Sequence, residues 1–100
     1  MIKHIVVWKL KPSAEGADRA ANARTMKQRL EALRGRVPGL RSLEVGVNYN
    51  TTAAAYDVAL VSEHDSREAL EVYQNHPEHL ACVDFIGKIR DQRVVVDYEV

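Results

Sequence analysis

Apolar side chains along this chain recur with two periods, one typical of strands and one typical of helices. Residues 3–11 have the strand period, and one parity of that segment carries His4, Val6, Trp8 and Leu10. The other parity places Ile5 and Val7 between lysines, so the middle of the segment is apolar on both faces. This pattern predicts a central strand covered on both sides. Pro12 ends it, and Ser13 is expected to cap a helix.

The segment from Ser13 to Arg34 has the helical period. Apolar residues recur there at spacings of three and four: Ala20, Ala23, Met26, Leu30 and Leu33. Charged and amide side chains fill the opposite face, which predicts an amphipathic helix. Gly35 and the Val37-Pro38-Gly39 turn are expected to end it.

Two strands, a broken helix and a last strand are expected in the rest of the chain. Residues 43–49 alternate like a half-exposed edge strand, and residues 56–62 are apolar on both parities, like a second central strand. Asp65, with Glu68 three residues on, resembles a capping box and predicts a helix start. Pro77 can begin a second helical segment, and residues 93–100 predict the final strand.

The element order predicts one α+β domain over residues 1–100. Strand, helix, strand, strand, broken helix, strand is the order of a ferredoxin-like βαββαβ fold with a four-stranded antiparallel sheet. Its helices can cover only one face of that sheet. The other face would expose Ile5, Val7, Ala59 and Val61 with side chains of the last strand. Such an apolar face predicts a homodimer formed through the sheet.

Composition narrows the classes of partner. The chain has 14 basic and 14 acidic residues and no formal net charge, which argues against nucleic acid and anionic membrane as partners. No apolar run is long enough to span a bilayer, and lysines interrupt the one at the N-terminus. A single cysteine, Cys82, excludes an internal disulfide and fits a reducing compartment. We therefore expect a cytoplasmic protein.

The most informative stretch is Tyr-Gln-Asn-His-Pro-Glu-His at residues 73–79. A spacing of three would place Tyr73, His76 and His79 near one another, but Pro77 interrupts the helix. A break there can aim Tyr73 and His79 at one point beneath the helices. His4 shares its strand parity with Val6 and can reach the same space. Imidazole can exchange a proton near neutral pH, and a phenol can donate to a developing oxyanion.

Structural and metal-binding roles remain open for the same residues. His4 and Tyr73 can be core side chains with one satisfied polar atom, and His76 before Pro77 can be a helix cap. His4, His76 and His79 could supply three nitrogens to a metal, but the spacing is weak evidence for a site, and we expect no metal and no cofactor. His64, on a turn before the expected helix cap, is predicted to face solvent.

The sequence resembles the stress-responsive A/B barrel (Dabb) family over nearly its whole length. The resemblance rests on the opening His4-Ile5-Val6-Val7, the Tyr73-x-x-His76-Pro77-x-His79 motif, the Val37-Pro38-Gly39 turn and Asp97. It implies a ferredoxin-like protomer that pairs sheet to sheet into a dimeric α+β barrel.

In a plant polyketide cyclase of this family, of the olivetolic acid cyclase type, a tyrosine and a histidine form the catalytic dyad. The resemblance carries these roles to Tyr73 and His79, and it carries pocket positions to His4, Val6 and Trp8. Val58 stands where the cyclase has another pocket histidine, and we count it with His76 as a substrate-binding candidate. Trp8 and Arg93 are bulkier or more polar than an alkyl-tail pocket requires, so the plant substrate is not carried over.

Three functions follow as hypotheses. The first is a cofactor-independent cyclase or isomerase that acts on a small keto or phenolic compound, with Tyr73, His79 and His4 as catalytic residues. The second is a non-catalytic dimer that binds a small ligand or serves as a stress-related scaffold. The third and weakest is a cofactor-free monooxygenase, since related dimeric barrels perform that chemistry.

Overall fold

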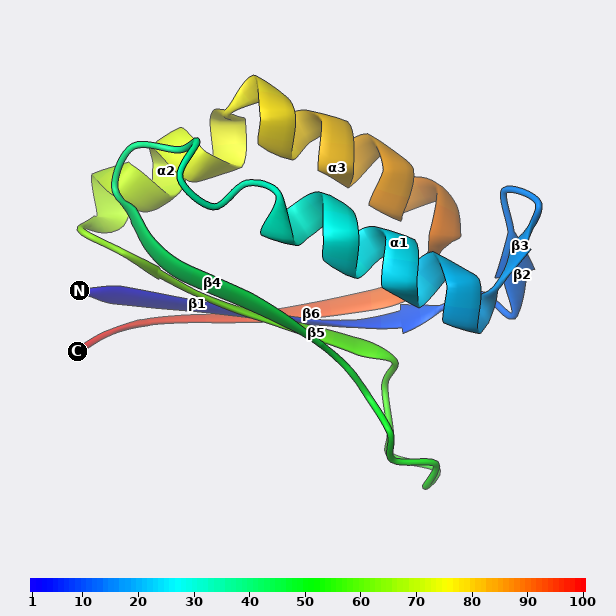
Figure 1. Ribbon diagram of the computed structural model, residues 1–100. Coiled ribbons are helices and arrows are strands. Elements are labelled where there is room, and N and C mark those ends of the chain that lie inside the picture. Colours follow the sequence, from blue (N-terminus) through cyan, green and yellow to red (C-terminus); the bar gives the residue numbers. More distant parts are fainter.

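In a computed structural model that describes residues 1–100, the helices form one layer on a four-stranded antiparallel sheet (Figure 1). The sheet contains four strands: β1 (Ile2–Leu10), β4 (Leu40–Val47), β5 (Val58–His64) and β6 (Arg90–Glu99). The helices are α1 (Arg19–Glu31), α2 (Arg67–Asn75) and α3 (Pro77–Ile89). The strand order β4-β5-β1-β6 confirms the ferredoxin-like α+β fold and the central position of the two doubly apolar strands.

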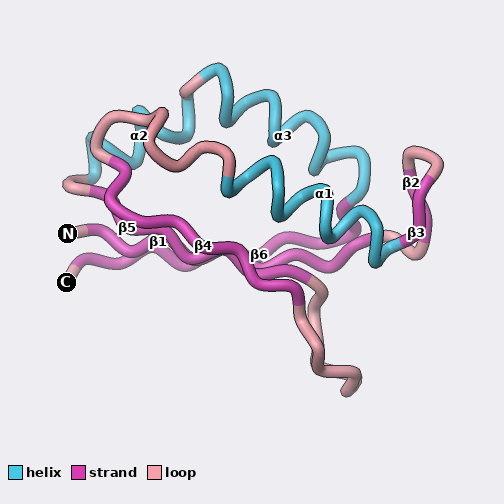
Figure 2. Tube along the Cα trace, viewed as in Figure 1, coloured by secondary structure: helices cyan, strands magenta, loops and turns pink.

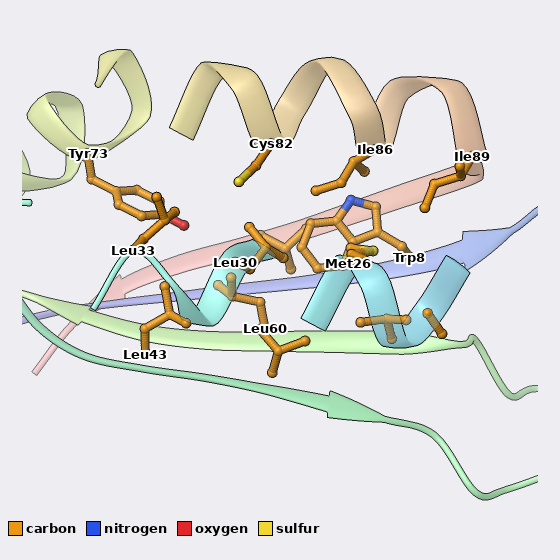
Figure 3. Close-up of a cluster of buried hydrophobic side chains, with 14 of the residues drawn as sticks. Trp8, Met26, Leu30, Leu33, Leu43, Leu60, Tyr73, Cys82, Ile86 and Ile89 are labelled. Atoms are coloured by element: carbon orange, nitrogen blue, oxygen red, sulfur yellow. The ribbon is translucent and has the colours of Figure 1, made fainter. Parts of the chain in front are cut away.

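The helices lie over one face of the sheet (Figure 2), and the buried apolar side chains of the two layers form the core. His4, Val6, Trp8 and Leu10 are buried on the helix-facing parity of β1. Val6, Trp8 and Leu10 belong to one apolar cluster with Met26 and Leu30 of α1 and Ile86 and Ile89 of α3. Figure 3 labels Trp8 together with these helical residues. Burial of such side chains stabilises each by about 1.5–3 kcal/mol relative to full exposure.

The first helix begins later than its sequence period indicates. Residues 13–18 form a small hairpin, β2 (Ser13–Ala14) and β3 (Ala17–Asp18), instead of a first helical turn. Glu15 and Gly16 make the turn with positive φ angles of 52° and 75°. Asp18, not Ser13, is the cap, because its carboxylate accepts a hydrogen bond from the Ala21 amide at 2.8 Å. The predicted start at Ser13 is therefore wrong.

Two boundaries around β5 also differ from the prediction. The cap of α2 is Ser66, whose hydroxyl accepts from the Ala69 amide at 3.1 Å, while Asp65 forms an ion pair with Arg41. β5 extends to His64, which is fully buried on the helix-facing side of the sheet. The prediction that His64 faces solvent is wrong, because the strand continues through Ser62 and keeps the parity of Leu60.

The opposite face of the sheet carries no helix (Figure 1). On β6 this face presents Val94, Val96 and Tyr98, which are between 43% and 59% exposed. These residues pair in register with Val7, Ile5 and Lys3 of β1. The β4–β5 connection projects on this same side. None of the helices is long and apolar enough to cross a membrane.

Candidate functional site

A cavity of about 280 Å³ lies between α2, α3 and the helix-facing side of β1 and β6. Its wall consists of His4, Val6, Trp8, Leu30, Leu60, Tyr73, His79, Val83, Ile86, Arg90 and Arg93. The structure therefore brings all three catalytic candidates and two of the predicted pocket residues, Val6 and Trp8, to one space. Val58 pairs with Trp8 on the sheet and is buried, but neither it nor His76 contributes to this wall.

The break between α2 and α3 positions the two rings of the motif. His76 has an extended backbone (φ −65°, ψ 134°), and Pro77 occupies the first helical position of α3. The His76 ring caps this helix by accepting a hydrogen bond from the Glu78 amide at 3.2 Å. His76 is thus a structural residue here, as a pre-proline cap would be. Across the break, the Tyr73 and His79 ring centroids are 4.3 Å apart.

The protonation state of His79 follows from its hydrogen bond. The Nδ1 atom lies 3.1 Å from the carbonyl oxygen of Gln74, which can only accept, so Nδ1 carries the proton. Nε2 is then the basic nitrogen of the neutral ring. Burial lowers the pKa of His79 below its ordinary value, although the Gln74 carbonyl opposes this shift. The ring is therefore a neutral imidazole at pH 7.

Tyr73 is 1% exposed, and its side chain reaches from α2 into the space above the sheet (Figure 3). Burial raises the pKa of the Tyr73 phenol well above its ordinary value of 10. The group stays protonated at every physiological pH and can donate a hydrogen bond. Another wall residue, Trp8, has a buried indole N–H with no acceptor in the protein. Such unsatisfied buried donors are uncommon in native proteins.

The ring of His4 forms a hydrogen bond with a residue of another strand, which the sequence pattern of β1 alone cannot identify. Its Nδ1 forms a short hydrogen bond with the carboxylate of Asp97, which lies opposite it on β6. The same contact is an ion pair when the ring is protonated. A carboxylate on one ring nitrogen fixes the tautomer and the orientation of an imidazole, so Nε2 is the free nitrogen of His4. His4 is 3% exposed and lines the cavity.

A second buried polar pair lies behind Tyr73. His64 Nε2 and Ser62 Oγ are 2.8 Å apart, and both residues are fully buried. The other nitrogen of His64, Nδ1, has no partner. Burial, with a smaller contribution from His4, lowers the pKa of His64 to about 4. The His64 and Tyr73 ring centroids lie 4.9 Å apart, so the pair supports the tyrosine from the sheet side.

Sequence reasoning missed Val83, Ile86 and Arg90 as wall residues. Val83 and Ile86 lie four and seven residues after His79, on the same face of α3, and Arg90 directly follows that helix at the start of β6. That periodicity was available in the sequence. No group of three or more His, Cys, Asp or Glu side chains is arranged to hold a metal ion.

The chain belongs to the Dabb family, the stress responsive A/B barrel domain, whose sequence model matches residues 2–100. An uncharacterised protein from Streptomyces coelicolor is 33% identical over 99 residues, which cover 99% of both chains. A dimeric ferredoxin-like protein of unknown function from Bacteroides fragilis has a similar structure, with a TM-score of 0.87 and 32% identity over 99% of this chain and 95% of that one.

More distant structures with the same fold include enzymes. A hydroxynitrile lyase from Passiflora edulis has a TM-score of 0.76 and 17% identity, covering 97% of this chain and 90% of that one. A putative antibiotic biosynthesis monooxygenase from Nitrosomonas europaea has a TM-score of 0.79 and 15% identity, covering 100% and 98%. At these identities the likeness concerns the fold alone.

Proposed function

We propose that this protein is a cofactor-independent enzyme of the cyclase or isomerase kind, which removes a proton beside a carbonyl group of a small keto or phenolic compound. His79 is the general base, Tyr73 donates a hydrogen bond to the enolate oxygen, and His4 orients the substrate.

The state of His79 is the observation that carries this proposal. A general base must be unprotonated before the reaction and must have a free lone pair within reach of the substrate. The Gln74 carbonyl holds the proton on Nδ1, and burial keeps the ring neutral. Nε2 is left as the acceptor on a ring that lines the cavity.

The Tyr73 phenol supports the second half of the reaction. An enolate oxygen gains negative charge as the carbon proton leaves, and a nearby donor in a dry site lowers the energy of that state. Burial keeps the Tyr73 hydroxyl protonated, so it can serve as that donor. A substrate that displaces water from the largely apolar wall would strengthen both polar contacts.

The size of the cavity supports a small substrate. Pockets for drug-sized ligands occupy roughly 300–1,000 Å³, and this cavity of about 280 Å³ is slightly smaller than that range. One aromatic ring with a short keto side chain suits that volume. His4, fixed by Asp97, presents Nε2 as a further polar contact for such a compound.

We also propose that the protein acts as a homodimer, with the uncovered sheet face as its interface. Val94, Val96 and Tyr98 with Ile5 and Val7 make a contiguous apolar surface that a second copy can cover. The dimeric ferredoxin-like relative from Bacteroides fragilis supports this assembly. The cytoplasmic location expected from the sequence stays part of this proposal.

Deuterium exchange tests the activity even while the natural substrate is unidentified. The protein is incubated in D₂O with benzoylacetone and with phenylpyruvate, and loss of the C–H signal beside the carbonyl is followed by NMR. We expect faster exchange than in buffer for at least one of them, and a loss of about 10²–10⁴-fold in the His79→Ala variant. If exchange at the background rate is found for both compounds, the non-catalytic ligand-binding dimer replaces this proposal.

A further inference from the structure

The charges in the cavity wall are all positive. Arg90 and Arg93 line the cavity, and no Asp or Glu does. The carboxylate of Asp97 lies on the same strand as Arg93, but it is bonded to His4 and is not part of the wall. An anionic group that enters the cavity therefore meets two guanidinium groups and no opposing negative charge.

Neither of these arginine side chains has a hydrogen-bond or ion-pair partner within the chain. Most of the other arginines do have such partners: Arg19, Arg34, Arg36, Arg41 and Arg67 form ion pairs with carboxylates, and Arg29 stacks on Phe85. Arg24, which is exposed on α1 outside the cavity, is the other unpaired arginine. The fold thus pairs its arginines in most places and leaves the two at the cavity free.

The positions of the two arginines place them opposite the reactive end of the cavity. Arg93 is the register partner of Trp8 on the edge strand, so it shares the helix-facing side of the sheet. Arg90 is the C-cap residue of α3, has an extended backbone and begins β6. His79 and Arg90 are eleven positions apart along the helix, which corresponds to roughly 16 Å between their backbones. Long arginine side chains can shorten that span to the length of a small aromatic acid.

We propose that the cavity binds a substrate that carries a carboxylate, held by Arg93 with Arg90 beside it, while the carbonyl end lies at Tyr73 and His79. A guanidinium matches a carboxylate with two parallel N–H···O bonds, which gives orientation as well as affinity. The substrate class is then a small keto acid. The placement of the carbonyl rests on the function proposed above, whereas the preference for an anion does not.

The positive charge of Arg93 also affects the pKa of His79, the proposed base. After burial, the positive charges of neighbouring groups, Arg93 among them, help to lower the pKa of His79. A carboxylate bound at Arg93 would offset part of that charge. The bound anion would make His79 a somewhat stronger base once the substrate is in place.

Binding of benzoate and of benzamide tests the preference directly, because the two probes differ in charge and are nearly equal in size. Titrations of the full-length protein at low salt, followed by NMR shifts of cavity residues, give both affinities. We expect benzoate to bind at least about 10-fold more tightly, since hydrogen bonds to charged groups contribute about 1.5–3 kcal/mol. Equal affinities, or no detectable benzoate binding, would overturn the proposal.

Matched variants separate the site from a general effect of net charge. Arg93→Gln should weaken benzoate binding by about 10-fold and leave benzamide binding unchanged. Arg24→Gln removes the same charge from an exposed position outside the cavity and should change neither affinity. If Arg24→Gln weakens benzoate binding as much as Arg93→Gln does, the anion is attracted by the whole molecule and the proposed site is wrong.

The two proposals fail in different ways. If benzoate is preferred but neither benzoylacetone nor phenylpyruvate exchanges deuterium, the anion site stands and the proposed enzyme activity falls. If benzoylacetone exchanges through His79 while benzoate and benzamide bind equally, the activity stands and the keto acid assignment falls.

Discussion

The rings of Tyr73 and His79 lie against each other, with centroids 4.3 Å apart, although they belong to different helices. An unbroken helix would place residues six apart on different sides of its axis. Pro77 begins a new helix after the extended His76, and the change of direction turns the His79 ring back under α2. Pro77 thus determines where the second helix begins. This break between the helices brings a base and a hydrogen-bond donor to one cavity.

Replacing Tyr73 with Phe should separate activity from stability. Tyr73 is buried, and its hydroxyl makes no hydrogen bond to another group of the chain, so its removal breaks none within the protein. We expect an unfolding temperature equal to or above that of the wild type, and a loss of roughly 10²-fold or more in enolate formation. Calorimetry and deuterium exchange measure the two effects. A variant that unfolds at lower temperature with normal exchange would make Tyr73 a structural residue only.

The pH dependence of exchange should reveal the neutral state of His79. Its pKa lies below the ordinary value of 6.5, so the active, unprotonated form dominates at neutral pH. We expect kcat/KM to be level above pH 7 and to fall on the acid side, with a midpoint below 6.5. A midpoint above 6.5 would mean that a different group is the base.

The order of the elements could be predicted because each strand and helix has its own period. β1 and β5 are apolar on both parities, and this marked them as central strands. The ends of the strands and helices were harder to predict, because a polar residue can continue a strand or a helix. Ser62 and His64 keep the buried parity of β5, so reading the parity two residues further would have placed His64 in the core.

The site could be predicted only in part, since its halves come from distant segments. The motif identified Tyr73 and His79, and strand parity identified His4 and Trp8. The partnership of His4 with Asp97 depends on the register between β1 and β6, which no local pattern reports. Val58, the register partner of Trp8, has the buried parity of β5 but does not line the cavity, which depends on the packing above the sheet and not on parity.

Metal removal should leave the activity unchanged. No three or more His, Cys, Asp or Glu side chains are arranged to hold a metal ion, and the proposed proton transfer by His79 needs none. We expect equal exchange rates before and after dialysis against a strong chelator, with no stoichiometric transition metal in untagged protein. Activity that disappears with the chelator and returns with added Zn²⁺ would assign a metal to the site and contradict the proposed mechanism.

A charge on the uncovered sheet face should weaken the dimer. Val96 is 59% exposed and pairs with Ile5 on that face, so Val96→Asp alters the interface with little effect on the isolated fold. We expect a dimer of the wild type at micromolar concentration and a shift to monomer in the variant, measured by light scattering. Val72→Asp, at a valine 47% exposed on α2, is the matched control and should remain dimeric. A monomeric wild type would contradict the proposed assembly.

The buried Ser62–His64 pair should make stability depend on pH. The pKa of His64 is about 4 in the folded protein and 6.5 when unfolded, so the folded state binds fewer protons between these values. The contribution of the neutral His64 ring to the free energy of unfolding is fully present above pH 6.5, and it declines as the pH falls towards 4. The loss amounts to about 3 kcal/mol in the free energy of unfolding.

Urea unfolding at pH 7 and at pH 4 measures this loss, and a double variant isolates it. Ser62→Ala with His64→Leu removes both polar partners, which avoids leaving one of them buried without a hydrogen bond. The carboxylates and His79 titrate in both proteins, so the difference between the two pH dependences belongs to His64. We expect the wild type to lose about 3 kcal/mol more than the double variant between pH 7 and pH 4. Equal losses would show that His64 is not held neutral beneath Tyr73, and the sheet side of the cavity would then carry a charge at mildly acid pH.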